Sequence, residues 1–163
     1  MDKVGTSIPA LAVPSSGPSV AVAFGGGGAR GVAHIHIIET LDALGIKPVA
    51  ISGSSIGVKD AMENGLRLGQ FNVERILEAF LPDSVARTFE ELKIPTKIMV
   101  TDYYGHCEVV CEAGDLRTAI AASAAIPAVF RPVVIGDRIM IDGGIFNPVP
   151  FDKLSGLVDI IIG

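Results

Sequence analysis

The sequence predicts an α/β fold with a mainly parallel central sheet. Two short apolar runs, at 20–24 and 49–51, flank a glycine run and a stretch with helical periodicity. Strand, glycine loop, helix and strand thus follow one another within about 40 residues, which is the order of a βαβ unit. Strands of such units are buried on both faces, and the uninterrupted apolar runs agree with that burial.

The N-terminal half begins with a tail at 1–18, where proline, serine and glycine interrupt every element. A strand is expected at 20–24, followed by the glycines and a helix that extends to about Leu44. Gly45 ends that helix. The residues that share its apolar face are Ile37, Leu41 and Leu44, with His34 at the border.

The C-terminal half alternates apolar runs with turn signals. Asp115 is placed to cap a helix, in which Ser123 is expected to be a small packing residue. Gly136-Asp137 is expected to form a tight hairpin turn. The expected elements are a helix at 73–81, strands at 97–103 and 106–111, a helix from Asp115 to Pro127, a hairpin of 133–135 with 138–141, and a strand at 157–162.

Composition limits the function classes. The chain has 163 residues, which suits one domain at 19–163, and a net charge of −5, which argues against a nucleic-acid binder. Hydrophobic residues make up 49% of the chain, enough for a sizeable core. We see no apolar run near the ~18 residues of a spanning helix and no secretory signal.

The two cysteines, Cys107 and Cys111, stand four residues apart on an expected strand. That spacing separates them by roughly 13 Å, too far for a disulfide. We therefore expect free thiols in a reducing compartment and a cytoplasmic location.

The pattern G-x-S-x-G occurs at 53–57, directly after an apolar run, with Ser55 at its centre. Such a serine lies on a tight strand-to-helix turn, and its hydroxyl projects above the end of the strand. The alternative is a βα loop that is rich in glycine and serine and has no chemistry.

The glycine run Gly25 to Gly28, with Ala29, Arg30 and Gly31, can gather several backbone N–H groups around an anion. That anion is either a bound phosphate or a developing oxyanion. The run lacks the Gly-Lys-Ser/Thr of a P-loop. The second strand also lacks the acidic residue that a dinucleotide site requires.

A carboxylate at a strand end, Asp142, is followed by two glycines. By itself this pattern also fits a turn aspartate that binds its own backbone. The three histidines are His34, expected to be buried, and His36 and His106, expected at the surface. None follows Asp142, as a hydrolase triad would require, so the residues favour a Ser-Asp dyad.

Together these segments resemble the patatin-like phospholipase family, and its bacterial single-domain members most. The family's three motifs are matched in order by 26–31, 53–57 and 142–144. The segments at 101–102, 121–133 and 147–150 also resemble the family. The resemblance implies a three-layer α/β/α fold and a lipid acyl hydrolase, with Ser55 as nucleophile, Asp142 as base, and an oxyanion hole of Gly26, Gly27 and Gly28.

The resemblance leaves two roles open for Arg30, which either orients the loop or meets a substrate phosphate; a salt bridge within the loop is a third reading. The family implies a lipid or other acyl-ester substrate and neither cofactor nor metal. Any membrane contact is expected to be peripheral, through apolar residues around the site. The sequence carries no signal for oligomeric state.

The chain departs from the family after Gly57. Val58, Lys59, Asp60 and Glu63 follow where small apolar residues of a buried helix are expected, and buried charge is costly. The stretch from Ser55 to Asp142 is also short for the family. We therefore expect a missing segment near 57–58 and a further one after 163.

Two other functions compete with the hydrolase. One is a non-catalytic phosphate- or nucleotide-binding module that uses the glycine run. The other is a degenerate member of the family that serves as a regulatory domain. Labelling of Ser55 by a fluorophosphonate distinguishes the hydrolase from both.

Overall fold

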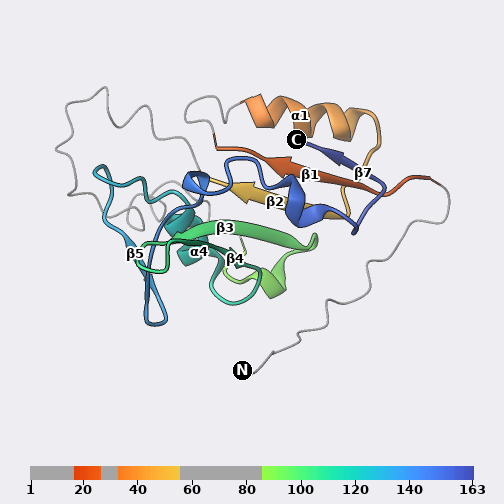
Figure 1. Cartoon of the computed structure of the whole chain (residues 1–163). Helices are drawn as coiled ribbons and strands as arrows, with labels where there is room; N and C mark the ends of the chain where they lie inside the picture. Colours follow the sequence, from red (N-terminus) through yellow and green to blue (C-terminus); the bar gives the residue numbers. More distant parts are fainter. Residues whose placement is uncertain (1–16, 27–32, 56–85) are drawn as a thin grey trace.

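The computed structural model describes residues 17–26, 33–55 and 86–163, and Figure 1 shows their arrangement. Four expectations lie outside these residues. They are the tail up to residue 16, the loop positions Gly27, Gly28 and Arg30, the helix at 73–81, and the discontinuity at 57–58.

A seven-stranded mixed sheet forms the centre of the described chain. Its order is β5-β6-β3-β2-β1-β7, and β4 pairs with β3. The strands are β1 (Val20–Phe24), β2 (Ala50–Ser54), β3 (Thr96–Asp102), β4 (Cys107–Cys111), β5 (Val133–Ile135), β6 (Arg138–Asp142) and β7 (Ile160–Ile162).

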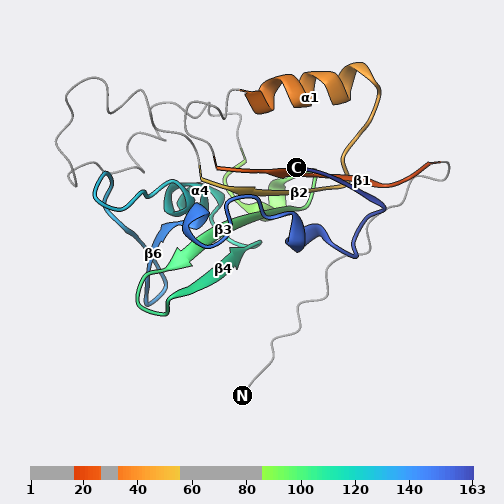
Figure 2. The ribbon, with the colours of Figure 1, turned by 45° about the horizontal axis from the view of Figure 1, so that its top comes forward.

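The parallel half of the sheet consists of β7, β1, β2 and β3. The α-helix α1 (Ala33–Ala43) connects β1 to β2 and completes the expected βαβ unit. Along β1, Ala21 and Ala23 pack on one face of the sheet, together with Leu154. Val22 and Phe24 point to the other face, toward α1, which lies above the sheet in Figure 2.

The antiparallel half contains β4, β5 and β6. Strand β4 pairs with β3 along one edge. The other edge of β3 is shared, because β2 pairs with it up to Ser54↔Met99 and β6 pairs with it from Val100↔Asp142 onward. The two strands run in opposite directions, so the C-terminal ends of β2 and β6 meet at adjacent residues of β3.

Helical segments cover both faces of the sheet. The second α-helix, α4 (Leu116–Ser123), packs its alanines against Val100 and Met140. Phe24 and Ile98 are both in register with Gly53, so their side chains point to the same face of the sheet. Phe24 faces α1 and Ile98 packs against α4, and the two helices therefore lie on the same face. The opposite face is covered by the 3-10 helix η4 (Phe151–Leu154), whose Leu154 is fully buried.

The fold class is confirmed, and most element bounds agree with the expectation to within a few residues. Asp115 caps α4, accepting a 2.6 Å hydrogen bond from the Thr118 N–H. The hairpin turns at Gly136, whose φ is +64°. Both cysteines are free. The 3-10 helices η2 (Phe89–Glu91), η3 (Gly143–Ile145) and η4 were not expected from the sequence.

Two strand bounds differ from the expectation for physical reasons. Strand β2 continues through Ser52, Gly53 and Ser54, which are poor strand formers, because these residues pair with β1 or β3. The last strand begins only at Ile160, where its pairing with Val20 begins.

Substituting Gly143 by Ala is expected to destabilise the protein strongly. A Cβ at this position would lie 2.0 Å from the Met99 carbonyl oxygen, which belongs to the central strand β3 and cannot move freely. Overpacking of this kind costs about 3 kcal/mol in the free energy of unfolding. Chemical denaturation of Gly143→Ala measures the loss.

The matched control is Gly53→Ala on the neighbouring strand. A Cβ there meets only the Phe24 carbonyl oxygen, at 3.9 Å. Its free energy of unfolding is expected to stay within about 1 kcal/mol of the wild type. Equal stability of the two variants would contradict the shared-edge geometry around Met99.

Candidate active site

Ser55 stands immediately after β2, at the point where the chain leaves β3. Its φ is +56°, a left-handed conformation that a residue with a side chain rarely adopts. Such strain costs about 1–3 kcal/mol and persists only where the surroundings fix it, most often at functional sites. Ser55 therefore occupies the sharp turn that its motif predicts.

Asp142 is the last residue of β6, and its backbone is fixed on both sides. Its N–H donates to the Ala125 carbonyl at 3.0 Å. Its carbonyl accepts a 2.9 Å hydrogen bond from the Thr101 hydroxyl. Its carboxylate oxygen Oδ1 accepts the Gly144 N–H at 2.7 Å, and Gly144 must lack a side chain because a Cβ would lie 2.9 Å from the same oxygen.

The two predicted residues meet directly. Ser55 Oγ donates a 2.5 Å hydrogen bond to Asp142 Oδ2, although 87 positions separate them in the sequence. The short distance suits transfer of the hydroxyl proton to the carboxylate. The meeting of β2 and β6 on one edge of β3 is what brings them together.

Burial raises the pKa of the Asp142 carboxyl above its ordinary value, and hydrogen bonds from Ser55 and Gly144 only partly offset that effect. Asp142 is 6% exposed, so its charged form loses most of its contact with water. A carboxylate with a raised pKa is a stronger base than an ordinary aspartate. The burial thus adapts Asp142 to accept a proton.

The start of the glycine run lies against this pair. A Cβ at Gly26 would lie 3.0 Å from Ser55 Cβ, and a Cβ at Gly25 would lie 2.8 Å from Val149 Cγ2, so a side chain at either position would force its neighbour to shift. The Gly26 N–H, however, donates to the Pro148 carbonyl at 2.8 Å. The Gly26 amide is thus engaged by a backbone carbonyl in this structure, and the oxyanion role expected for Gly26 stays a prediction.

The histidines do not take part in this pair; His36 and His106 are exposed as expected, whereas His34, expected to be buried, is only partly so. Among the hydrogen bonds of the described residues, none joins a histidine to Ser55 or Asp142. His34 is half-buried, with its ring centroid 5.0 Å from that of Phe24. His36 is exposed and lies 3.2 Å from Glu39, and His106 is exposed in the turn before β4.

A polar cluster holds the segment after Asp142 in place. Lys153 Nζ contacts Glu108 and lies 2.8 Å from Asp152. Asn147 Nδ2 donates to Glu108 at 2.9 Å and to Asp152 at 2.7 Å. These contacts tie the segment to β4 and so fix the Pro148 carbonyl that holds Gly26.

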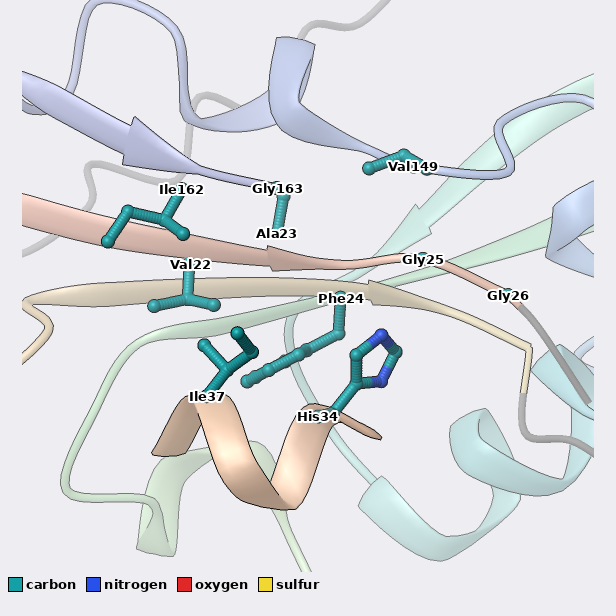
Figure 3. A pocket seen from close by; sticks show the side chains of 10 residues that line it. All are labelled: Val22, Ala23, Phe24, Gly25, Gly26, His34, Ile37, Val149, Ile162 and Gly163. Carbon is teal, nitrogen blue, oxygen red and sulfur yellow. The ribbon is translucent and has the colours of Figure 1, made fainter. Parts of the chain in front are cut away.

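A cavity of about 390 Å³ opens beside the glycine run, between α1 and the ends of β1 and β7 (Figure 3). Its size falls within the usual range of ligand pockets. In Figure 3 His34 and Ile37 of α1 point toward Phe24 and Val22 of β1. The lining consists of Val22, Ala23, Phe24, Gly25, Gly26, His34, Ile37, Val149, Ile162 and Gly163.

Three contacts of the site were not anticipated from the sequence. They are the hydroxyl of Thr101, the carbonyl of Pro148 and the hydroxyl of Ser123, which accepts the Ser55 N–H at 3.0 Å. The family-like segments around these residues were the available signal. The expectation for Ser123 was packing alone; it is buried as expected, and its hydroxyl also accepts a hydrogen bond from the turn at Ser55.

Within the described ranges, no His, Cys, Asp and Glu side chains gather in a group of three or more that could hold a metal ion. The helices of those same ranges are all too short or too polar to cross a bilayer.

Comparison with known proteins identifies the family. Residues 60–155 match the sequence profile of a family described as Patatin-like phospholipase. This match includes Asp142 and begins after Ser55. An uncharacterised NTE family protein of Mycobacterium tuberculosis is 34% identical over 170 residues, covering 88% of this chain and 47% of the relative.

Fungal relatives are more distant. The lysophospholipase NTE1 of Candida albicans is 22% identical over 174 residues, covering 86% of this chain and 12% of the relative. The lysophospholipase NTE1 of Cryptococcus neoformans is 26% identical, with 90% and 11% covered. The chain thus spans about half the length of the mycobacterial relative and a small part of the fungal ones.

Replacing Asp142 by Asn is expected to stabilise the protein at neutral pH. The folded-state pKa of Asp142 is raised, so the folded state binds this proton more tightly than the unfolded state does. The stability that comes from this tighter proton binding is present below the unfolded pKa of about 3.9 and is lost as the pH rises through the folded-state pKa of Asp142. Denaturation of both proteins across a pH series measures the difference, which should disappear in acid.

Asp152→Asn is the control of opposite sign. Hydrogen bonds from Asn147 and Lys153 lower the pKa of Asp152, so its contribution is present above the unfolded pKa and is lost in acid. This variant should be slightly less stable than the wild type at neutral pH. If Asp142→Asn were also less stable than the wild type at neutral pH, that result would contradict the increase in the pKa of Asp142 by burial.

Proposed function

The chain belongs to the patatin-like phospholipase family, and we propose that it is a lipid acyl hydrolase that cleaves carboxylic esters with a Ser-Asp dyad. The observation that carries the proposal is the 2.5 Å hydrogen bond from Ser55 Oγ to Asp142 Oδ2. A loop that only binds phosphate has no need of a serine on a strained turn against a buried carboxylate. The geometry therefore favours the hydrolase over the binding module.

In the proposed reaction, Asp142 accepts the hydroxyl proton while Ser55 Oγ attacks the ester carbonyl carbon. The carbonyl π electrons move to oxygen and give a tetrahedral oxyanion. As this intermediate collapses, the bond to the alcohol breaks, and Asp142 returns the proton to the leaving oxygen. Water then attacks the acyl carbon of the acyl-serine and loses a proton to Asp142, giving a second tetrahedral intermediate. As that intermediate collapses, the bond from the acyl carbon to Ser55 Oγ breaks, Asp142 returns the proton to Ser55 Oγ, and the carboxylic acid is released.

The developing oxyanion needs backbone donors. We propose the amides of Gly27 and Gly28, because the Gly26 amide is held by Pro148. A single donor of this kind is worth about 3 kcal/mol in comparable hydrolases. The role proposed for Gly26 is instead to bring the loop close to Ser55, which its missing side chain permits.

We also propose peripheral contact with a lipid surface, through apolar side chains beside the dyad. Ile145 and Phe146 follow Asp142 closely in the chain and are 52% and 50% exposed. Apolar side chains at this position can enter the outer part of a bilayer, where the substrate's ester lies.

The dyad is tested by two substitutions. Ser55→Ala removes the nucleophile and Asp142→Asn removes the base, so each is expected to lower kcat for a p-nitrophenyl ester on the order of 10⁴-fold. The matched control is Ser54→Ala, since Ser54 is the adjacent buried serine and its hydroxyl has no hydrogen-bond partner among the residues that the structure describes. Full turnover by the Ser55 and Asp142 variants would refute the assignment.

The apolar cavity is proposed to receive the acyl chain of the substrate, because it begins at Gly26 beside Ser55. Ile37→Trp fills part of it and should reduce kcat/KM for long-chain p-nitrophenyl esters about tenfold while sparing the acetate. Ile35→Trp is the control, because Ile35 lies on the same helix, 53% exposed and outside the lining. An equal effect on both chain lengths would contradict this placement.

A further inference from the structure

Ser123 connects three parts of the site through one hydroxyl. It is the last residue of α4 and is 3% exposed. Its Oγ donates to the Met99 carbonyl at 2.7 Å and accepts the Ser55 N–H at 3.0 Å. A single side chain therefore links helix α4, strand β3 and the turn that carries Ser55.

The position of this hydroxyl coincides with the divergence of two strands. Ser54 is the last residue of β2 to pair with β3, and its partner there is Met99. At the next residue the chain turns with φ of +56° and leaves the sheet. The Ser123 hydroxyl lies between the Ser55 N–H, which has left the sheet, and the Met99 carbonyl, which belongs to β3. A hydroxyl can bond both groups because it donates and accepts.

A strained turn keeps its geometry only if contacts on several sides define it. The side chain of Ser55 is held by Asp142, and its backbone N–H is held by Ser123. These two hydrogen bonds fix different atoms of one residue. The first sets the direction of the hydroxyl, and the second sets the orientation of the peptide that bears it.

We propose that Ser123 is a positioning residue, whose hydroxyl holds the Ser55 backbone in the turn that presents the nucleophile to the ester. The inference rests on the proposed function, because it assigns Ser55 as the nucleophile. Within the described residues, the Ser123 hydroxyl bonds the Ser55 N–H and the Met99 carbonyl and has no hydrogen bond to Ser55 Oγ. Its loss should therefore slow the attack by Ser55 and leave substrate binding unchanged.

The test is Ser123→Ala, a smaller residue that favours a helix and leaves the packing of α4 intact. We expect kcat for a p-nitrophenyl ester to fall on the order of 10- to 100-fold, because small displacements of reacting groups reduce rates by such factors. KM should stay within about twofold. Exchange of the Ser55 amide hydrogen, followed by NMR, should accelerate by at least about tenfold.

Ser52→Ala is the matched control. Ser52 is a fully buried serine on the same strand β2, and its hydroxyl donates to the Pro150 carbonyl at 2.8 Å, away from Ser55. Removing it deletes one buried hydrogen bond of similar length. Its kcat and its Ser55 amide exchange should remain those of the wild type.

The outcomes separate the two proposals. If Ser55→Ala retains turnover, the proposed hydrolase fails, and the role of Ser123 fails with it. If Ser55→Ala is inactive while Ser123→Ala keeps kcat within about twofold, only the positioning role is overturned. Loss of folding in Ser123→Ala, or an equal effect of Ser52→Ala, would assign Ser123 a purely structural role and overturn the inference.

Discussion

The site depends on one constraint, which is that two strands share a single edge of β3. Strand β2 occupies the edge up to Met99 and β6 occupies it from Val100 onward. Because the two strands approach from opposite directions, neither can continue, and both must turn away at the junction. The residues at the two turns are Ser55 and Asp142. The proximity of Ser55 and Asp142 is thus a consequence of sheet topology.

Electrostatics gives this junction its chemical character. The ends of the strands exclude water from Asp142, and the resulting increase in the pKa of its carboxyl makes it a better base at some expense of stability at neutral pH. In the proposed reaction, Asp142 therefore accepts the serine proton without a neighbouring histidine. Among the described residues, the Ser55 hydroxyl and the Gly144 N–H donate to Asp142 and hold the carboxylate in place without neutralising its charge.

Local signals in the sequence predicted much of this structure. Glycines, the Asp115 cap and apolar runs predicted the strands, α1, α4 and the hairpin, and the three motifs predicted that Ser55 and Asp142 would act together. The family resemblance, now supported by the profile match, supplied the roles expected of these two residues. The roles assigned to Gly27, Gly28 and Arg30 stay predictions, because those residues lie outside the described ranges.

The contacts that the sequence did not reveal are long-range ones. The family-like segments around Ser123 and Pro148 single out these stretches, but they do not indicate that the two oxygens meet the amides of Ser55 and Gly26, which lie 68 or more positions away. Likewise, Ser52 to Ser54 enter a strand against their own propensity because neighbouring strands pair with them. Tertiary pairing decides such features, and a single sequence records it only indirectly.

The pH dependence of the rate at which a fluorophosphonate modifies the protein, with the modified residue mapped by mass spectrometry, tests the coupling of Ser55 to Asp142 most directly. The adduct should form on Ser55, at a rate that rises through a single ionisation above the ordinary aspartate pKa of about 3.9. An adduct on Ser54 or Ser123, or a rate of modification that is the same in Asp142→Asn, would contradict the coupling of Ser55 to Asp142.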